Sequence, residues 1–395
     1  MRVLVNFLPL LPRGGGLQNA WNLWRAVAEH GGAHEWRALA RPDLGLAGVA
    51  DAPHMQLDET PAPSLTRRLH LENVVMPRLA REWRADVVFT PMGAGPLRGP
   101  TPRVMGWHDS TVAYPESVVH RRIDRRERLS EGLRARMAGA AARRASRVCV
   151  QTPTMARRLA RRWNVPLARF HVVPNGPSAI LAGEVPAPVR PEGGRDVLVV
   201  AEAKPAKNLE VVPLVAAALR RRGVRDVRLV VTVAPAGDPL TRPLDRALAE
   251  AGPGIPVVRI GRVAHKDLGR LYRGAGAVFL PSLLESFSAT YVEAMHFGVP
   301  LVTSDLDFAR DICGDAALYA DPLDPEACAD ALATALGDAE TRARLREAGF
   351  RRLRSFPTWR DRLGLYVAAL EAAVAEAGLA RRPQPVPSPP LGGRP

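Results

Sequence analysis

Short apolar segments recur along the chain and alternate with longer stretches in which apolar residues return every three or four positions. In the first part of the chain, the apolar segments cover residues 3–7, 86–90, 104–107, 147–150 and 170–173. In the second part they cover residues 196–201, 228–233, 256–260, 276–280 and 301–304. Strands that alternate with amphipathic helices are typical of parallel sheets with helices on both faces. The pattern therefore predicts an α/β protein with doubly wound parallel sheets.

A stretch rich in proline and glycine, between residues 174 and 194, separates the two series of strands and favours an interdomain join. We predict an N-terminal Rossmann-like domain over residues 1–178 and a C-terminal one over residues 192–355. Ligands of such sheets bind beyond the carboxyl ends of the strands, so a cleft between the domains is expected. Residues 381–395 are rich in proline and glycine, and we predict that this tail is disordered.

The composition is that of an ordinary globular protein, because 47% of the 395 residues are hydrophobic and 24% are charged. Three widely spaced cysteines suggest neither a disulfide framework nor a zinc site, which favours the reducing cytosol. No apolar run reaches the roughly 18 residues that a membrane span needs. The apolar residues 3–8 lead into Gly14-Gly15-Gly16 without a cleavage site, so they are predicted to be a strand and not a signal peptide.

The chain is strongly basic, with 55 Lys and Arg against 40 Asp and Glu. Within residues 121–162 the basic residues are Arg121, Arg122, Arg125, Arg126, Arg128, Arg134, Arg136, Arg143, Arg144, Arg147, Arg157, Arg158, Arg161 and Arg162. Such a surface attracts polyanions. No nucleic acid is expected, because the segment has no interleaved aromatic residues and no zinc-finger spacing. Contact with an anionic membrane and a plain solvated helical surface both stay open.

Lysines are rare, and two of the three fall in one loop. Lys204 and Lys207 lie between the strand at 196–201 and a predicted helix that begins near residue 208. An ammonium group on a flexible stem reaches phosphate as a point charge. The loop is therefore a candidate phosphate site.

A second candidate follows the strand at 277–280. Glu285 lies in a turn and Glu293 lies eight residues later in a predicted helix that stops at Gly298. Ser286 or Ser288 is the expected N-cap, so backbone N–H groups and the positive end of the helix dipole would form an anion site. The two carboxylates would then reach the groups on either side of a diphosphate, which is the order of parts in a nucleotide sugar.

This stretch resembles the Glu-x7-Glu signature of the retaining GT-B glycosyltransferases of family four, although Ser286 and Ser288 stand where that family has glycines. The resemblance implies that Glu285 and the backbone amides of the following residues hold the sugar and the diphosphate, and that Glu293 binds ribose. The implied donor-binding residues are Ser286, Phe287, Ser288, Ala289, Glu293 and Val263. It also implies that residues 356–378 form a terminal helix that crosses back to the N-terminal domain.

The lysine loop also resembles a turn of this family, in which a Gly-Arg pair precedes Lys-Asn. Lys207 and Asn208 match the end of that turn, but Ala201 and Glu202 stand in place of Gly-Arg, so an acid replaces one cation. Lys204 is expected to supply the lost charge, or else the site is weaker than usual.

Two N-terminal features are expected to face the cleft. The glycine turn 14–16 permits close backbone approach, and its position resembles the family's Gly-Gly loop, so Gly15 and Gly16 are assigned to donor binding. His108 follows the strand at 104–107 and is succeeded by Asp109. A histidine there can bind a hexose hydroxyl or polarise a reacting group, and the resemblance places a functional histidine at this position.

No metal or other cofactor is expected. Asp305 and Asp307 form a D-x-D triplet, but no further oxygen ligands cluster nearby in the sequence, and Asp307 is interpreted as a helix N-cap.

The predicted function is transfer of a hexose-type sugar from a nucleotide-diphosphate donor to an acceptor hydroxyl, with retention. His108 and Glu285 are the predicted catalytic residues. The acceptor would be a saccharide or a lipid-linked molecule, in envelope polysaccharide or glycolipid synthesis. The protein would be cytoplasmic, on the inner face of the membrane if residues 121–162 bind lipid. The alternatives are a GT-B nucleotide-sugar epimerase and a non-catalytic basic protein that binds polyanions or membranes.

Overall fold

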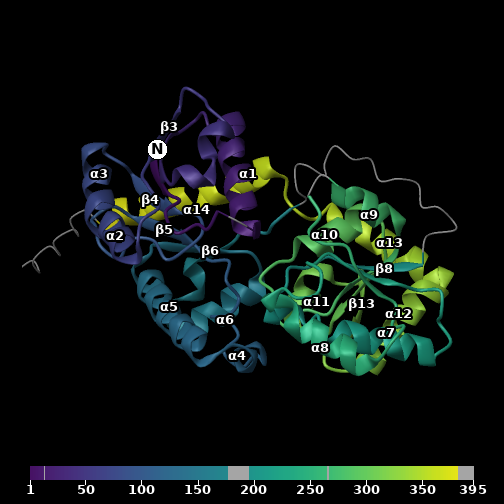
Figure 1. Cartoon of the computed structure of the whole chain (residues 1–395). Helices are drawn as coiled ribbons and strands as arrows, with labels where there is room; N and C mark the ends of the chain where they lie inside the picture. The colour runs from purple at the N-terminus through teal and green to yellow at the C-terminus, as the bar shows by residue number, and fades with distance from the viewer. Residues whose placement is uncertain (13, 177–194, 265–266, 381–395) are drawn as a thin grey trace, which may run out of the picture.

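The computed structural model describes residues 1–12, 14–176, 195–264 and 267–380. The described residues form two α/β lobes, each built on one parallel sheet, and Figure 1 shows them side by side. The prediction of two doubly wound parallel-sheet domains is confirmed. The predicted disordered tail lies outside the described residues, as does most of the proline-rich join.

The N-terminal sheet has the strand order β3-β2-β1-β4-β5-β6-β7, and each neighbouring pair of its described strands is parallel. Its strands are β1 (Arg2–Asn6), β2 (Glu35–Ala40), β3 (Met55–Glu59), β4 (Val87–Thr90), β5 (Arg103–Gly106), β6 (Arg147–Val150) and β7 (Phe170–Val172). Side chains alternate across the sheet, so Val3 and Val5 join one core cluster while Leu4 joins another. The apolar segment at the start of the chain is therefore a strand, with β2 and β4 on either side.

The C-terminal sheet has the order β10-β9-β8-β11-β12-β13 and is also parallel. Its strands are β8 (Asp196–Val199), β9 (Leu229–Val231), β10 (Val257–Arg259), β11 (Ala275–Leu280), β12 (Leu301–Ser304) and β13 (Ala317–Ala320). The central strands are buried on both faces, which explains why they are continuous apolar runs in the sequence.

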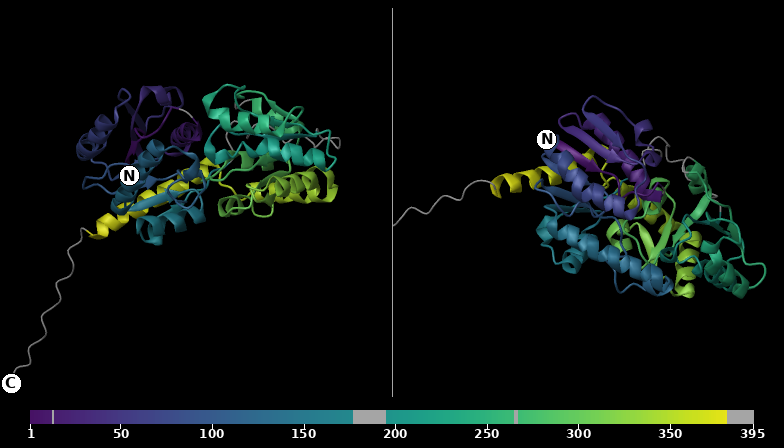
Figure 2. Two further views of the ribbon diagram at one scale, coloured as in Figure 1. Left: turned by 60° about the horizontal axis from the view of Figure 1, so that its bottom comes forward. Right: turned by 60° about the vertical axis from the view of Figure 1, so that its left-hand side comes forward.

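Helices cover both faces of each sheet (Figures 1 and 2). In the N-terminal lobe they are α1 (Gly14–His30), α2 (Leu65–His70), a π-helical turn η3 (Leu71–Val75), α3 (Met76–Glu82), α4 (Val119–Arg122), α5 (Arg125–Arg144) and α6 (Pro153–Trp163). In the C-terminal lobe they are α7 (Val211–Arg221), α8 (Arg242–Ala251), α9 (Leu268–Gly274), α10 (Ala289–His296), α11 (Asp307–Cys313), α12 (Pro325–Gly337) and α13 (Ala339–Leu353). The short helix η5 (Pro205–Lys207) ends the lysine loop.

The last helix, α14 (Trp359–Ala380), packs on the N-terminal lobe although it follows the C-terminal one in sequence. Tyr366 lies against Phe89 of β4, with ring centroids 5.2 Å apart. Leu363 and Leu370 are buried in the same core cluster as Trp24 of α1. Figures 1 and 2 show α14 in yellow along the N-terminal lobe.

The sequence pattern did not predict three of the described strands, β2, β3 and β13. β2 and β3 carry charged residues at several positions, and β13 is a four-residue strand at the sheet edge. β3 and β13 lie at the edges of their sheets, where one side needs no strand partner and polar residues are tolerated. The glycine turn also differs from expectation, because Gly14–Gly16 form the first turn of α1 and do not precede it.

The lobes are joined by contacts that α11 makes with α6 and with Tyr114, in the loop that follows β5. The Tyr114 hydroxyl donates to Asp307 Oδ1 at 2.9 Å, and Arg158 Nε donates to Asp307 Oδ2 at 2.9 Å. The Thr154 N–H donates to Asp311 at 2.9 Å. The interpretation of Asp307 as an N-cap is wrong: Leu306 holds that position, and the Asp307 carboxylate is turned toward the other lobe.

Candidate functional site

The lysine loop and the Glu285 turn meet at the carboxyl edge of the C-terminal sheet. β8 leads into the first and β11 into the second, and these strands are neighbours. Lys207 Nζ donates to Glu285 Oε1 at 2.5 Å, and the Ser282 hydroxyl donates to the same oxygen at 2.8 Å. Both ends of this ion pair are mostly buried. Two loops 78 residues apart therefore form one polar cluster.

Glu202 lies at the centre of a second group of charges at the same edge. Its carboxylate pairs with Lys204 at 2.5 Å. Burial pushes the pKa of Glu202 upward, but the hydrogen bond and charge of Lys204, with the charges of Lys207 and Arg262, hold that pKa below its usual value. The acid that replaces the expected arginine is thus surrounded by the positive charges of Lys204, Lys207 and Arg262.

The glycine turn of the N-terminal lobe approaches this group. Gly14 has a φ of +74°, and a Cβ built there would lie 3.6 Å from Glu202 Oε1. Gly15 has open space around it and is exposed, while Gly16 packs near Leu10. The start of α1 and the Glu202 loop are therefore in contact range across the two lobes.

The start of α10 differs in one detail from its prediction. Ser288 holds the N-cap position, but its side chain makes no capping hydrogen bond, and Ser286 lies two residues earlier. The predicted N-cap position of Ser288 is therefore confirmed, but the capping hydrogen bond expected of its hydroxyl is absent. Phe287 is buried and meets Phe356 edge to face at 5.7 Å, which fixes the turn that carries Glu285. Ala289 begins the helix and is exposed.

Glu293 is buried on α10, where it accepts a hydrogen bond from the Tyr272 hydroxyl at 2.6 Å. Burial and the charge of Glu293 raise the pKa of Tyr272, so that hydroxyl remains a donor. The Tyr272 ring stacks on Phe297 at 5.3 Å. Val263 follows β10 and packs on the same core cluster as Tyr272.

His108 follows β5 at the carboxyl edge of the N-terminal sheet. The ring keeps some solvent contact but lies deep among protein atoms, and this burial, with the nearby charge of Arg362, lowers its pKa to about 3. His108 is therefore neutral at physiological pH. Asp109 beside it accepts from the Thr111 N–H at 2.9 Å and pairs with Arg134 at 3.1 Å.

Arg362 was not foreseen from the sequence, although it is among the most buried charged residues, with 1% of its surface exposed. Its guanidinium donates to Asn175 Oδ1 at 2.7 Å and to Asn19 Oδ1 at 3.4 Å, and it stacks on Trp359 at 3.7 Å. Burial lowers its pKa, and its Nε has no hydrogen-bond partner in the described structure. Its sequence context gave no signal, because Arg360 lies two residues before it in the same helix and the pattern does not distinguish the two arginines.

Three further residues were missed. Ser282 precedes Glu285 in a motif already singled out, and Tyr272 and Arg262 lie in segments without any motif. The described residues contain no group of three or more acidic, histidine or cysteine side chains that could hold a metal. Asp305 instead pairs with Arg310 at 2.5 Å.

Comparison with known families gives two adjoining matches. Residues 184–352 match the model described as "Glycosyl transferases group 1", and residues 13–177 match "Glycosyltransferase Family 4". The two matches correspond to the two lobes.

Among characterised proteins, a D-inositol 3-phosphate glycosyltransferase of Salinispora tropica is 34% identical over 186 residues. The match covers 45% of this chain and 39% of that relative, so it spans well under two thirds of the relative's length.

Two solved structures share the architecture of the whole chain. Sucrose-phosphate synthase of Thermosynechococcus elongatus has a TM-score of 0.68 at 18% identity, covering 95% of this chain and 100% of its own. An Anabaena protein solved with UDP-glucose has a TM-score of 0.66 at 16% identity, covering 93% of this chain and 100% of its own. These likenesses show the GT-B fold, and the two family matches, which together cover most of the chain, show that it belongs to the group 1 glycosyltransferases.

Proposed function

We propose that the protein transfers a hexose-type sugar from a nucleotide-diphosphate donor to an acceptor hydroxyl, with retention at the anomeric carbon. The observation that carries this proposal is the contact between Lys207 and Glu285, which combines a phosphate-binding cation with a sugar-binding carboxylate at one sheet edge. The glycine turn of the other lobe comes near the same edge at Gly14. The UDP-glucose bound to the Anabaena protein is the kind of donor that we expect.

In the proposed reaction, the bond from the anomeric carbon to the diphosphate breaks while the acceptor oxygen bonds to that carbon from the same face. The acceptor's proton passes to the departing phosphate. Negative charge grows on the diphosphate, and Lys207, Lys204 and the amides of residues 286–289 would stabilise it. Neutral His108 would orient a hexose hydroxyl, and Glu293 would bind ribose. Because Lys204 and Lys207 would neutralise the diphosphate, the reaction would need no metal ion.

The test is thermal unfolding in EDTA with a panel of UDP-, GDP-, ADP- and dTDP-sugars. A donor at about 100 times its dissociation constant should add roughly 2.7 kcal/mol to the free energy of unfolding. We expect one donor class to stabilise the wild type and to lose this effect with Lys207→Ala. Arg246→Ala, which removes an exposed cation of α8, is the control and should keep the effect.

Failure of every nucleotide sugar to stabilise the protein would contradict the transferase. Stabilisation by a donor without transfer to any acceptor, but with conversion of its sugar, would favour the epimerase.

We also propose a peripheral contact with anionic membrane, on the cytoplasmic side, through the first half of α5. Leu129 and Leu133 are 70% and 56% exposed one turn apart, and Arg125, Arg126 and Arg136 are exposed near them. Exposed leucines beside arginines fit a surface of anionic headgroups over acyl chains. Among the described helices, none is both long and apolar enough to cross a membrane. Such a contact would bring the enzyme to a lipid-linked acceptor of envelope polysaccharide or glycolipid synthesis.

Sedimentation with phosphatidylglycerol and phosphatidylcholine vesicles tests this contact. We expect binding to the anionic vesicles alone, weaker at high salt and weaker in the double variant Leu129→Ser, Leu133→Ser. Leu240→Ser changes a leucine of similar exposure in the C-terminal lobe and should have no effect. Equal binding of all variants would exclude α5 as the contact.

A further inference from the structure

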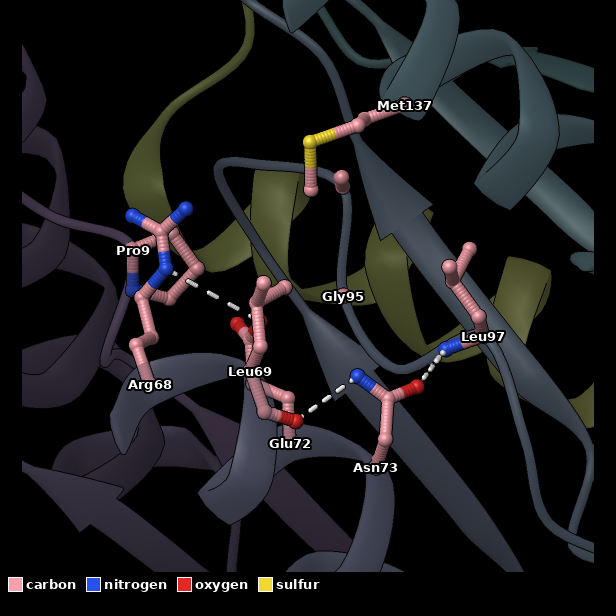
Figure 3. A pocket seen from close by; sticks show the side chains of 9 residues that line it. Pro9, Arg68, Leu69, Glu72, Asn73, Gly95, Leu97 and Met137 are labelled. Carbon is pink, nitrogen blue, oxygen red and sulfur yellow. Dashed lines mark hydrogen bonds and ion pairs between the residues drawn. The ribbon is translucent and has the colours of Figure 1, made fainter. Parts of the chain in front are cut away.

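A small pocket lies at the carboxyl edge of the N-terminal sheet, apart from the donor residues. Its cavity volume is about 30 Å³, and polar groups of Arg68, Glu72 and Asn73 and apolar groups of Pro9 and Met137 are among its lining (Figure 3). A volume of this size holds one water molecule or one hydroxyl group. Most of the lining is apolar, so the charged groups of Arg68 and Glu72 are its distinctive feature, and none of the roles assigned above uses them.

Glu72 is brought into this pocket by an irregular turn of the helix. It lies on the π-helical turn η3 between α2 and α3, a widened turn that proteins often carry at functional sites. The side chain is 4% exposed, and its Oε1 accepts from Asn6 Nδ2 at 3.0 Å at the end of β1. Burial raises the pKa of Glu72 above its usual value, while Asn6 and Arg68 act in the opposite direction. A buried carboxylate is costly, and an apolar residue would fill the space more stably.

Arg68 lies one helical turn before Glu72 and lines the same pocket, but it does not complete a hydrogen bond with Glu72. Arg68 Nε lies 3.9 Å from Glu72 Oε2, and Figure 3 draws this pair. That distance is too long for a hydrogen bond. Arg68 Nε is buried and has no hydrogen-bond partner in the described structure. A donor and an acceptor thus lie side by side without a direct hydrogen bond, and one hydroxyl group placed beside them can bond to both.

Asn73 does not share this property, because its side chain is engaged on both sides. Its Nδ2 donates to the Leu69 carbonyl at 2.9 Å, and its Oδ1 accepts from the Leu97 N–H at 2.8 Å. Asn73 therefore holds the loop that closes the pocket.

The same loop also contacts β5, the strand that leads to His108. Ala94, Gly95 and Leu97 line the pocket. Earlier in the same loop, the Gly93 N–H donates to the Gly106 carbonyl at 2.9 Å, two residues before His108. The pocket and His108 therefore lie at the same carboxyl edge of the N-terminal sheet, after the neighbouring strands β1, β4 and β5.

We propose that Arg68 and Glu72 form an acceptor subsite that binds one hydroxyl of a saccharide or cyclic polyol. The hydroxyl donates its hydrogen to Glu72 Oε2 and accepts from Arg68 Nε. This subsite deepens the proposed transferase and rests on it. The bound hydroxyl anchors the acceptor, while another hydroxyl of the same molecule reacts. Acceptors that lack a hydroxyl at the anchoring position leave the buried Glu72 carboxylate and the buried Arg68 Nε without a bridging partner and are rejected.

The test is saturation-transfer NMR with methyl α-D-mannopyranoside, methyl α-D-glucopyranoside and myo-inositol as probes, with UDP or the nucleotide found by the donor panel present. We expect at least one probe to bind the wild type and to bind about ten-fold more weakly to Glu72→Gln and Arg68→Met. Glutamine keeps an oxygen for Asn6, so the first variant should fold. Arg78→Met removes an exposed arginine of α3 that pairs with Glu82, and this control should bind like the wild type.

The subsite would be overturned if none of the three probes bound the wild type. It would also be overturned if Glu72→Gln and Arg68→Met, with unfolding temperatures equal to that of the wild type, bound the probes as tightly as the wild type does. The donor panel is a separate measurement. Probe binding that depends on Glu72, without any donor stabilisation, would retain the subsite and reject the transferase. If a donor stabilised the protein but the probes bound the variants and the wild type equally, the transferase would be retained and the subsite rejected.

Discussion

At the scale of single residues, the Glu202 carboxylate and the diphosphate of a bound donor would compete for the same positively charged side chains. Lys204, Lys207 and Arg262 all act on its carboxylate. We expect Glu202→Ala to raise the affinity for the donor's nucleotide diphosphate about three- to ten-fold, because the cations no longer have an internal anion. Isothermal titration with the nucleotide that stabilises the wild type measures this gain.

Glu250→Ala is the matched control for this change, since Glu250 is exposed on α8. Its affinity should equal that of the wild type. A loss of affinity in Glu202→Ala would mean that the carboxylate holds Lys204 in its binding position.

The lowered pKa of His108 predicts how the free energy of unfolding depends on pH. Its folded pKa, about 3, lies below the unfolded value near 6.5, so between these values the unfolded chain binds a proton that the folded protein does not. Stability contributed by neutral His108 is therefore present above pH 6.5 and is lost as the pH falls, by up to about 1.4 kcal/mol per pH unit. Urea unfolding of the wild type and His108→Gln at pH 7, 5.5 and 4.5 isolates this contribution.

The difference between the two proteins should shift in favour of the variant as the pH falls. A difference that stays constant would show that His108 titrates normally, and the burial argument would then fail.

At the scale of elements, the helix that carries Glu293 ends in a tight contact. Gly298 has a φ of +64°, and a Cβ built there would lie 2.9 Å from the Phe350 ring. Gly223 has a φ of +79° but open space around it. Both Gly→Ala changes should cost about 1 kcal/mol through backbone strain, and Gly298→Ala should cost more because Phe350 of α13 must move. Chemical unfolding of the two variants measures the difference, and equal losses would contradict a packing role.

The elements also show where sequence patterns suffice. β8 and β11 were predicted because they are buried on both faces and read as continuous apolar runs. β2 and β3 were missed because Glu35, Arg37 and Asp58 interrupt their patterns, and Arg37 and Asp58 pair with each other only once the strands lie side by side. The signal that fixes these strands is a contact between strands and is absent from either segment alone.

At the scale of the whole molecule, Asp307 ties the two lobes together. It accepts from Tyr114 and Arg158 of the N-terminal lobe. Asp307→Asn removes the charge that pairs with the guanidinium, so we expect looser coupling of the lobes and a larger radius of gyration in small-angle X-ray scattering. Asp315→Asn is the control, because Asp315 pairs with Arg351 inside the C-terminal lobe. Identical scattering from both variants and the wild type would show that the charge of Asp307 is not needed to hold the lobes together.

The sequence by itself determined the order of strands and helices in the centres of the sheets, the loops that hold Lys207, Glu285 and His108, and the family. These features depend on local periodicity, turn residues and short motifs, which each segment carries alone. The tertiary structure decided which of these groups touch. The contact of Lys207 with Glu285 and the approach of Gly14 to Glu202 join segments far apart in the chain. Likewise, burial lowers the pKa of Arg362 and raises that of Glu72, and this burial arises only when many segments pack together.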